Sequence, residues 1–175
     1  MDTAALERVK LIFSLFDVDG SGNLESNDFE LMSDRVLEAI PEAAEERKSA
    51  SVASFRQWWS TLAAELDTNN DNVITFEEFA ACVLSPERFE ETITEFAGAL
   101  TTLGDLDGDG LVTRPNFVSI MIGIGFALEN INALFAALEP NEADQITVES
   151  WDIAIKDFYR PDKSDIPGDR LVPQG

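Results

Sequence analysis

Three segments of twelve residues each place oxygen-bearing side chains at alternate positions. They read DVDGSGNLESND at 17–28, DTNNDNVITFEE at 67–78 and DLDGDGLVTRPN at 105–116. A hard cation such as Ca²⁺ takes about six to eight oxygen ligands, which such a loop supplies from its first, third, fifth, seventh, ninth and twelfth positions. The seventh residue offers its backbone carbonyl, and the sixth turns sharply and is usually glycine. The spacing therefore predicts three sites for a divalent metal ion.

The segment 67–78 has the fullest ligand set. Its closing residue is a glutamate, which can give both carboxylate oxygens to one ion. Asn72 takes the sixth position in place of glycine, and asparagine tolerates the left-handed backbone that this turn needs. Thr75 and the closing glutamate also match a capping box for the helix that follows. The candidate ligands are Asp67, Asn69, Asp71, the carbonyl of Val73, and Glu78.

The segment 17–28 closes with an aspartate, which is one methylene shorter than glutamate. The shorter arm offers the ion one oxygen, and fewer ligands suit six-coordinate Mg²⁺ better than Ca²⁺. We therefore expect a weaker or mixed Ca²⁺/Mg²⁺ site here. The candidate ligands are Asp17, Asp19, Ser21, the carbonyl of Asn23, and Asp28.

The segment 105–116 has three aspartates but closes with a neutral asparagine, which gives one carbonyl oxygen. We expect this site to bind Ca²⁺ with reduced affinity, and Mg²⁺ is possible here too. The candidate ligands are Asp105, Asp107, Asp109, the carbonyl of Leu111, and Asn116.

A fourth segment at 139–150 keeps the frame of such a loop without its ligands. Alanine stands at the fifth position (Ala143), aspartate at the sixth (Asp144) and serine at the twelfth (Ser150). We expect no ion here and assign the loop a structural role. Its eighth residue should pair with that of the third loop, Ile146 with Val112, as Leu24 should with Ile74.

Each of the four loops lies between two stretches whose apolar residues recur at helical spacing. The repeat predicts an all-α fold of eight helices, in four helix-loop-helix units that form two pairs within a compact domain. We place the first pair at 1–85, the second at 86–160, and a C-terminal tail at 161–175. The apolar stripes are interpreted as core, although Trp58 and Trp59 could line a ligand cavity.

The composition excludes several functions. Lys and Arg total 12 against 34 Asp and Glu, for a net charge of −22, which repels nucleic acids and anionic membranes. Histidine is absent, and no nucleophile–base motif is visible, so we expect no enzyme. The single cysteine, Cys82, allows no intrachain disulfide and is expected to be buried. No secretory signal or membrane span is evident, so a cytoplasmic location is expected.

With these motifs, the chain resembles the EF-hand superfamily, and in particular sarcoplasmic calcium-binding proteins and bacterial calerythrin-like proteins. The resemblance implies two EF-hand pairs packed through a common core and a role as a calcium buffer. A calcium sensor remains the alternative, although three methionines are too few for an adaptable Met-rich groove. Luciferin-binding proteins and photoproteins also look similar. Without histidine we expect no light emission, but an apolar ligand remains open. We expect a monomer, and a protein target stays undetermined.

Overall fold

The structure is a computed structural model that describes residues 3–67, 70–84, 89–160 and 166–172. Two features singled out in the sequence lie outside this description. They are the candidate ligand Asn69 and the side chain of Cys82.

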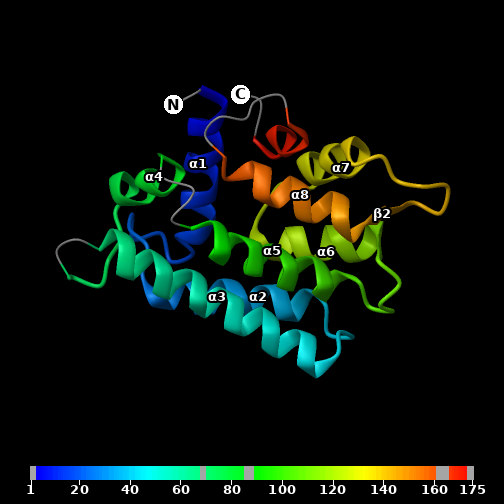
Figure 1. The fold of residues 1–175 in the computed structure, drawn as a ribbon, viewed down its shortest axis with the longest axis horizontal. Coiled ribbons are helices and arrows are strands. Elements are labelled where there is room, and N and C mark those ends of the chain that lie inside the picture. Colours follow the sequence, from blue (N-terminus) through cyan, green and yellow to red (C-terminus); the bar gives the residue numbers. More distant parts are fainter. Residues whose placement is uncertain (1–2, 68–69, 85–88, 161–165, 173–175) are drawn as a thin grey trace.

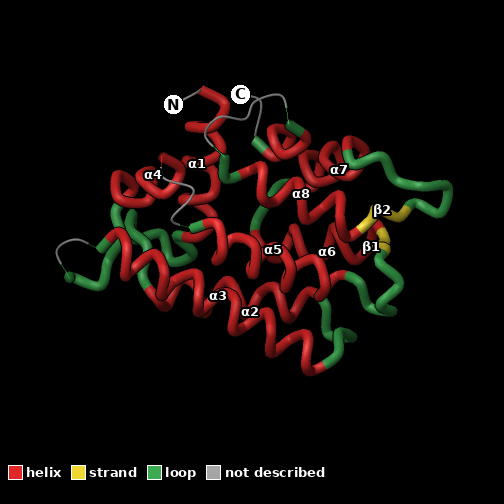
Figure 2. Tube along the Cα trace, viewed as in Figure 1, coloured by secondary structure: helices red, strands yellow, loops and turns green. Residues whose placement is uncertain are grey.

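Within the described residues the chain forms eight α-helices, which confirms the all-α prediction (Figures 1 and 2). Most of the described apolar side chains at helical spacing are buried, and each loop joins two of the helices. The helices are α1 (Thr3–Phe16), α2 (Ser26–Ala39), α3 (Glu45–Leu66), α4 (Phe76–Leu84), α5 (Glu90–Gly104), α6 (Arg114–Ile124), α7 (Leu128–Ala137) and α8 (Val148–Phe158).

Two short strands pair the third and fourth loops. Strands β1 (Leu111–Thr113) and β2 (Gln145–Thr147) are antiparallel, with Val112 opposite Ile146. In the first two loops a single antiparallel bridge joins Leu24 to Ile74. Both pairings agree with the sequence prediction. In Figure 2 the strand pair lies at one end of the long axis, and the loop between α3 and α4 lies at the other.

The two halves of the chain share one hydrophobic core. Helix α3 packs along α5, and α2 packs along α6, so each contact joins a helix of the first half to one of the second. Phe55 of α3 meets Phe96 of α5 edge to face at 5.2 Å between ring centroids. Trp58 is fully buried and contacts the rings of Phe89 and Tyr159. The relative positions of the loop pairs are therefore set by apolar packing.

The C-terminal segment folds back onto the body of the protein. A 3-10 helix, η2 (Pro167–Leu171), packs on α7 and α8 near the N-terminal end of α1 (Figure 1). Ile166 and Leu171 of this segment are buried. Arg8 of α1 is 1% exposed and forms an ion pair with Asp169 of η2. None of the described helices has the length and hydropathy that crossing a membrane would require.

Candidate metal centre

The three acidic loops share one internal hydrogen-bond pattern. In each, both carboxylate oxygens of the first-position aspartate accept hydrogen bonds from the backbone N–H groups of the fifth and sixth residues, at 2.8 to 3.2 Å. The sixth residue adopts positive φ in every case, and Asn72 does so at 63° as expected of a glycine substitute. These bonds wrap the backbone around the first carboxylate. The three acceptors are Asp17, Asp67 and Asp105.

The loop at 17–28 brings three carboxylates together. One oxygen from each of Asp17, Asp19 and Asp28 lies within 4.8 Å of the others. Asp28 is fully buried and accepts hydrogen bonds from the N–H groups of Glu25 (2.9 Å) and Asp19 (3.2 Å). Burial raises the pKa of Asp28, and the charges of Asp19 and Asp17 add to this. A cation among these carboxylates would relieve both costs.

The loop at 105–116 forms a second cluster of three carboxylates, from Asp105, Asp107 and Asp109, within the same 4.8 Å. The backbone N–H of Leu111 donates to Asp109 at 2.9 Å and holds the pKa of Asp109 below its usual value. A hydrogen bond with Asp109 raises the pKa of Asp107, because two carboxylates this close share a proton more easily than they both ionise. The site is thus strongly negative when it is deprotonated.

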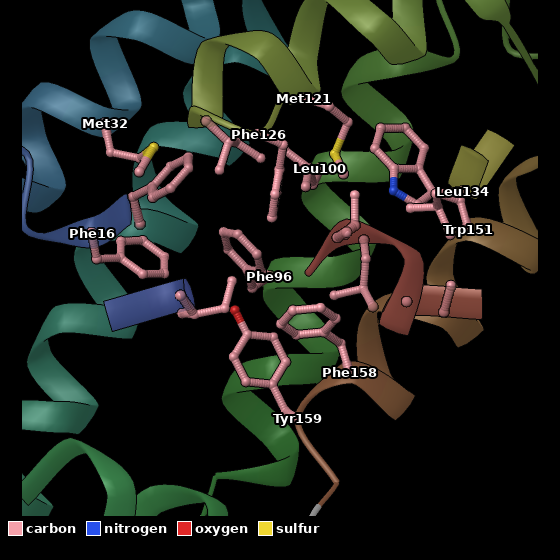
Figure 3. A pocket seen from close by; sticks show the side chains of 17 residues that line it. Phe16, Met32, Phe96, Leu100, Met121, Phe126, Leu134, Trp151, Phe158 and Tyr159 are labelled. Carbon is pink, nitrogen blue, oxygen red and sulfur yellow. The ribbon is translucent and has the colours of Figure 1, made fainter. Parts of the chain in front are cut away.

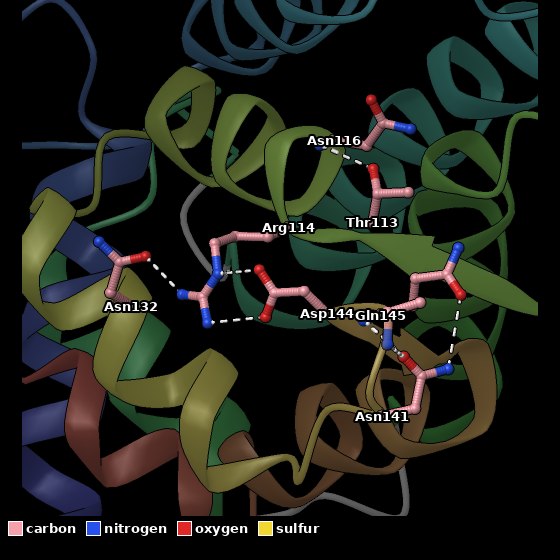
Figure 4. Close-up of polar contacts among 8 residues, drawn as sticks. Thr113, Arg114, Asn116, Asn132, Asn141, Asp144 and Gln145 are labelled. Carbon is pink, nitrogen blue, oxygen red and sulfur yellow. Dashed lines mark hydrogen bonds and ion pairs between the residues drawn. The ribbon is translucent and has the colours of Figure 1, made fainter.

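The closing residue of this loop reaches back toward its start. The side-chain amide nitrogen of Asn116 lies 3.5 Å from the carbonyl oxygen of Gly104, the residue before the first ligand. Its backbone N–H donates to Thr113 Oγ1, which caps α6 (Figure 4). A further residue that the sequence did not single out touches this loop. Arg47 of α3 donates to the carbonyls of Thr102 (3.0 Å) and Asp105.

The loop at 67–78 is arranged differently. Among its described carboxylates the structure forms no cluster like the other two. Glu78 Oε1 accepts a hydrogen bond from the N–H of Thr75 at 2.9 Å, and Thr75 Oγ1 accepts one from the N–H of Glu78 at 3.2 Å. The predicted capping box is therefore confirmed. Glu78 lies at the correct end of the loop to close a site.

The fourth loop organises itself with an amide side chain. Asn141 Oδ1 accepts hydrogen bonds from the N–H groups of Ala143 (2.9 Å) and Gln145 (3.0 Å). Glu139 and Asp144 both adopt positive φ, at 57° and 62°. The hydrogen bonds of Asn141 thus hold the middle of this loop in a turn.

The donor set of the first and third loops fits a hard divalent cation. All of the clustered groups are carboxylates, and such oxygens are the ligands that Ca²⁺ and Mg²⁺ prefer. The backbone carbonyls expected at the seventh positions, those of Asn23 and Leu111, belong to the same loops.

Comparison with known proteins assigns the first two loops to a family. Residues 6–84 match the family model described as an EF-hand domain pair. Residues 6–84 are therefore an EF-hand domain pair. Calerythrin from Saccharopolyspora erythraea is 26% identical over 91% of this chain and 94% of its own length. The beta chain of the sarcoplasmic calcium-binding protein from Penaeus sp. is 31% identical, over 60% of this chain and 59% of its own length.

Solved structures agree with the fold of the whole chain. A calcium-binding protein of Streptomyces coelicolor, described in connection with prokaryotic calcium-mediated regulation, has a TM-score of 0.74 and 26% identity, and covers 89% of this chain and 97% of its own. The photoprotein clytin has the same TM-score at 14% identity, covering 99% and 94%, which shows a shared fold. The relatives named from sequence are calcium-binding proteins, in line with the expectation of no enzymatic activity.

Proposed function

We propose that this EF-hand protein binds Ca²⁺ in the loops 17–28, 67–78 and 105–116 and acts as a calcium buffer. The two clusters of three carboxylates are the observation that supports this most directly. The loops 17–28 and 105–116 close without glutamate, so Mg²⁺ competes there. A monomer in the cytoplasm remains our prediction for the form in which it acts.

The arrangement of the core favours a buffer over a sensor. A sensor opens an adaptable, Met-rich groove when calcium binds. Met32 and Met121 are both buried in the interior, at 0% and 4% exposed. The packing of α3 on α5 and of α2 on α6 joins the two halves through large aromatic groups. Opening either half would expose this shared core, which costs about 25 cal/mol per Å² of apolar surface.

Calcium titration of the metal-free protein tests this proposal. We expect calorimetry to find three sites, two of them weakened by millimolar Mg²⁺. The signal of a dye that reports exposed apolar surface should fall as Ca²⁺ binds, because neutralised loops let the core close. A dye signal that rises with Ca²⁺ would instead indicate a sensor, and equilibrium dialysis in which the protein retains no Ca²⁺ would reject metal binding altogether.

A central cavity supports a second candidate function, the carriage of a small apolar ligand. The cavity has a volume of about 50 Å³ and is lined by apolar side chains from both halves (Figure 3). Trp151 lines it and is 1% exposed, and its indole Nε1–H has no hydrogen-bond partner. A buried donor without an acceptor is costly, and a ligand with a carbonyl or ether oxygen would supply that acceptor. Met32 and Met121 also line the cavity and can shift to fit a ligand.

Replacing Trp151 by phenylalanine tests the cavity. The space holds about four water-sized groups, so we choose 2-butanone as probe and 2-methylbutane as its match without an acceptor. We expect wild-type protein to bind 2-butanone more tightly, by NMR shifts of the indole N–H, and Trp151→Phe to abolish that preference in a ligand-observed titration. Trp58→Phe is the control, since Trp58 also buries an unpartnered Nε1–H but does not line the cavity. Equal binding of both probes to wild-type protein would reject this second function.

A further inference from the structure

Arg114 links three separate parts of the C-terminal half. It is the tenth residue of the loop 105–116 and the first residue of α6. Its Nε and Nη2 donate to the two carboxylate oxygens of Asp144 at 2.7 and 3.0 Å, and its Nη1 donates to Asn132 Oδ1 of α7 at 2.9 Å (Figure 4). The guanidinium carbon also lies 4.3 Å from the centroid of the Phe135 ring. The third loop is thus tied to both the fourth loop and α7 by one side chain.

The ion pair lies where the strand ladder between the two loops ends. Next to the paired strands, the backbone N–H of Arg114 donates to the carbonyl of Asp144 at 3.3 Å. In the first half of the chain, the described residues show only the single bridge between the two loops. There the equivalent tenth and sixth residues are Ser26 and Asn72, which cannot form an ion pair. The half of the chain with the longer strand pairing is thus the half that also has the ion pair.

Asp144 occupies an unusual backbone position. It is the sixth residue of its loop and has a φ of 62°, where the three acidic loops have glycine or asparagine. Such a conformation is unfavourable for most residues with a side chain and persists when surrounding contacts hold it. The hydrogen bond from Arg114 supplies such a contact. It keeps the pKa of Asp144 below its usual range, and Asp144 in turn raises the pKa of Arg114.

We propose that the guanidinium of Arg114 is the built-in cation of the fourth loop and a positioning residue for the metal site at 105–116. A metal ion organises each acidic loop, whereas the fourth loop takes its cation from the neighbouring loop. The C-terminal pair of loops is then held together by one metal ion and one arginine. The effect on metal affinity rests on the proposed Ca²⁺ site at 105–116, whereas the effect on the loop pair does not.

Two variants of opposite charge test this assignment. Arg114→Gln removes a positive charge and Asp144→Asn a negative one, so a purely coulombic influence on Ca²⁺ would strengthen the site in the first variant and weaken it in the second. If Arg114 instead positions the loop pair, both variants should change the Ca²⁺ affinity in the same direction. We expect each variant to weaken Ca²⁺ binding at 105–116 about threefold or more, because fewer molecules hold the two loops in the paired arrangement that binds the ion. The NMR signal of the Gly110 N–H reports this site specifically.

Amide hydrogen exchange gives a readout that needs no metal. In metal-free protein, the amides of β1 and β2 should exchange several-fold faster in either variant than in the wild-type protein. The double variant should lose no more protection from exchange than either single variant. Arg114→Lys keeps the charge without the planar fork and should restore only part of the protection. The matched control is Arg56→Gln, since Arg56 makes an exposed two-point contact with Glu30 (2.8 and 3.2 Å) in the first half of the chain, outside the loops 105–116 and 139–150.

The outcomes separate this proposal from the proposed function. Exchange rates and Ca²⁺ affinity in Arg114→Gln that match Arg56→Gln would overturn the role of Arg114, as would affinity changes of opposite sign in the two charge variants. If the wild-type protein bound no Ca²⁺ at 105–116, the proposed function would fail at that loop. Faster exchange in the metal-free variants would then still support Arg114 as the cation that holds the fourth loop.

Discussion

Replacing Arg8 by methionine should lower the free energy of unfolding by about 3 kcal/mol and release residues 166–172 from the core. Arg8 is 1% exposed and donates from Nε to the carbonyl of Phe158 and from Nη2 to that of Arg160, both at 2.9 Å. Its Nη1 donates to Asp169 of η2. Methionine fills the space of the arginine stem but has no donor, so these acceptors would lose a buried partner.

Thermal unfolding in saturating Ca²⁺ measures this effect. A loss of this size should lower Tm by roughly 6–12 °C for a chain of this length. Release of the tail should appear as faster tryptic cleavage at Arg170 under native conditions. Lys10→Met is the control on the same helix, because Lys10 is 53% exposed and makes only a 3.5 Å pair with Glu7. Its Tm should change little. If both variants melted at the same temperature, the contacts of Arg8 with the C-terminal segment would contribute nothing to stability.

Replacing Glu78 by glutamine should weaken Ca²⁺ binding at 67–78 about 100-fold or more, equivalent to about 2.7 kcal/mol. Glutamine keeps the side-chain oxygen that accepts from the N–H of Thr75, so the start of α4 should survive. What disappears is the negative charge and the second carboxylate oxygen that would hold the ion. Stability of the metal-free protein should therefore change little while the binding stoichiometry falls from three to two.

Glu77→Gln provides the control for this prediction. Glu77 is the exposed neighbour of Glu78 in the first turn of α4, and its substitution removes the same formal charge. Calorimetry should find three sites in Glu77→Gln. An unchanged stoichiometry of three in Glu78→Gln would mean that binding at the loop 67–78 does not depend on Glu78 and that this loop is not the strongest site.

The loops could be predicted from the sequence because their chemistry is local. The position of a ligand within twelve residues follows from backbone geometry, so alternating aspartates and a turn residue suffice to place the carboxylates of the first and third loops. The same holds for the capping box of Thr75 and Glu78, which spans three residues. The pairing of Val112 with Ile146 also follows, since the eighth residues of partner loops share a register.

Contacts between distant segments could not be predicted, because no local pattern says which partner a charged side chain will meet. Arg8 lies among the apolar residues of the α1 stripe, and that position alone hinted at a buried role. Its partner Asp169 is 161 residues away. The contacts of Arg47 with the third loop depend in the same way on how α3 packs along α5.

By itself, the sequence determined the eight helices and the four loops, and it predicted which residues of three loops would bind a cation, because helical periodicity and loop spacing are short-range properties. Only the tertiary structure decided where Arg8 and Arg114 find their acids, and that a cavity remains at the centre of the core. These features depend on the packing of side chains from helices far apart in the chain, which local sequence patterns do not specify.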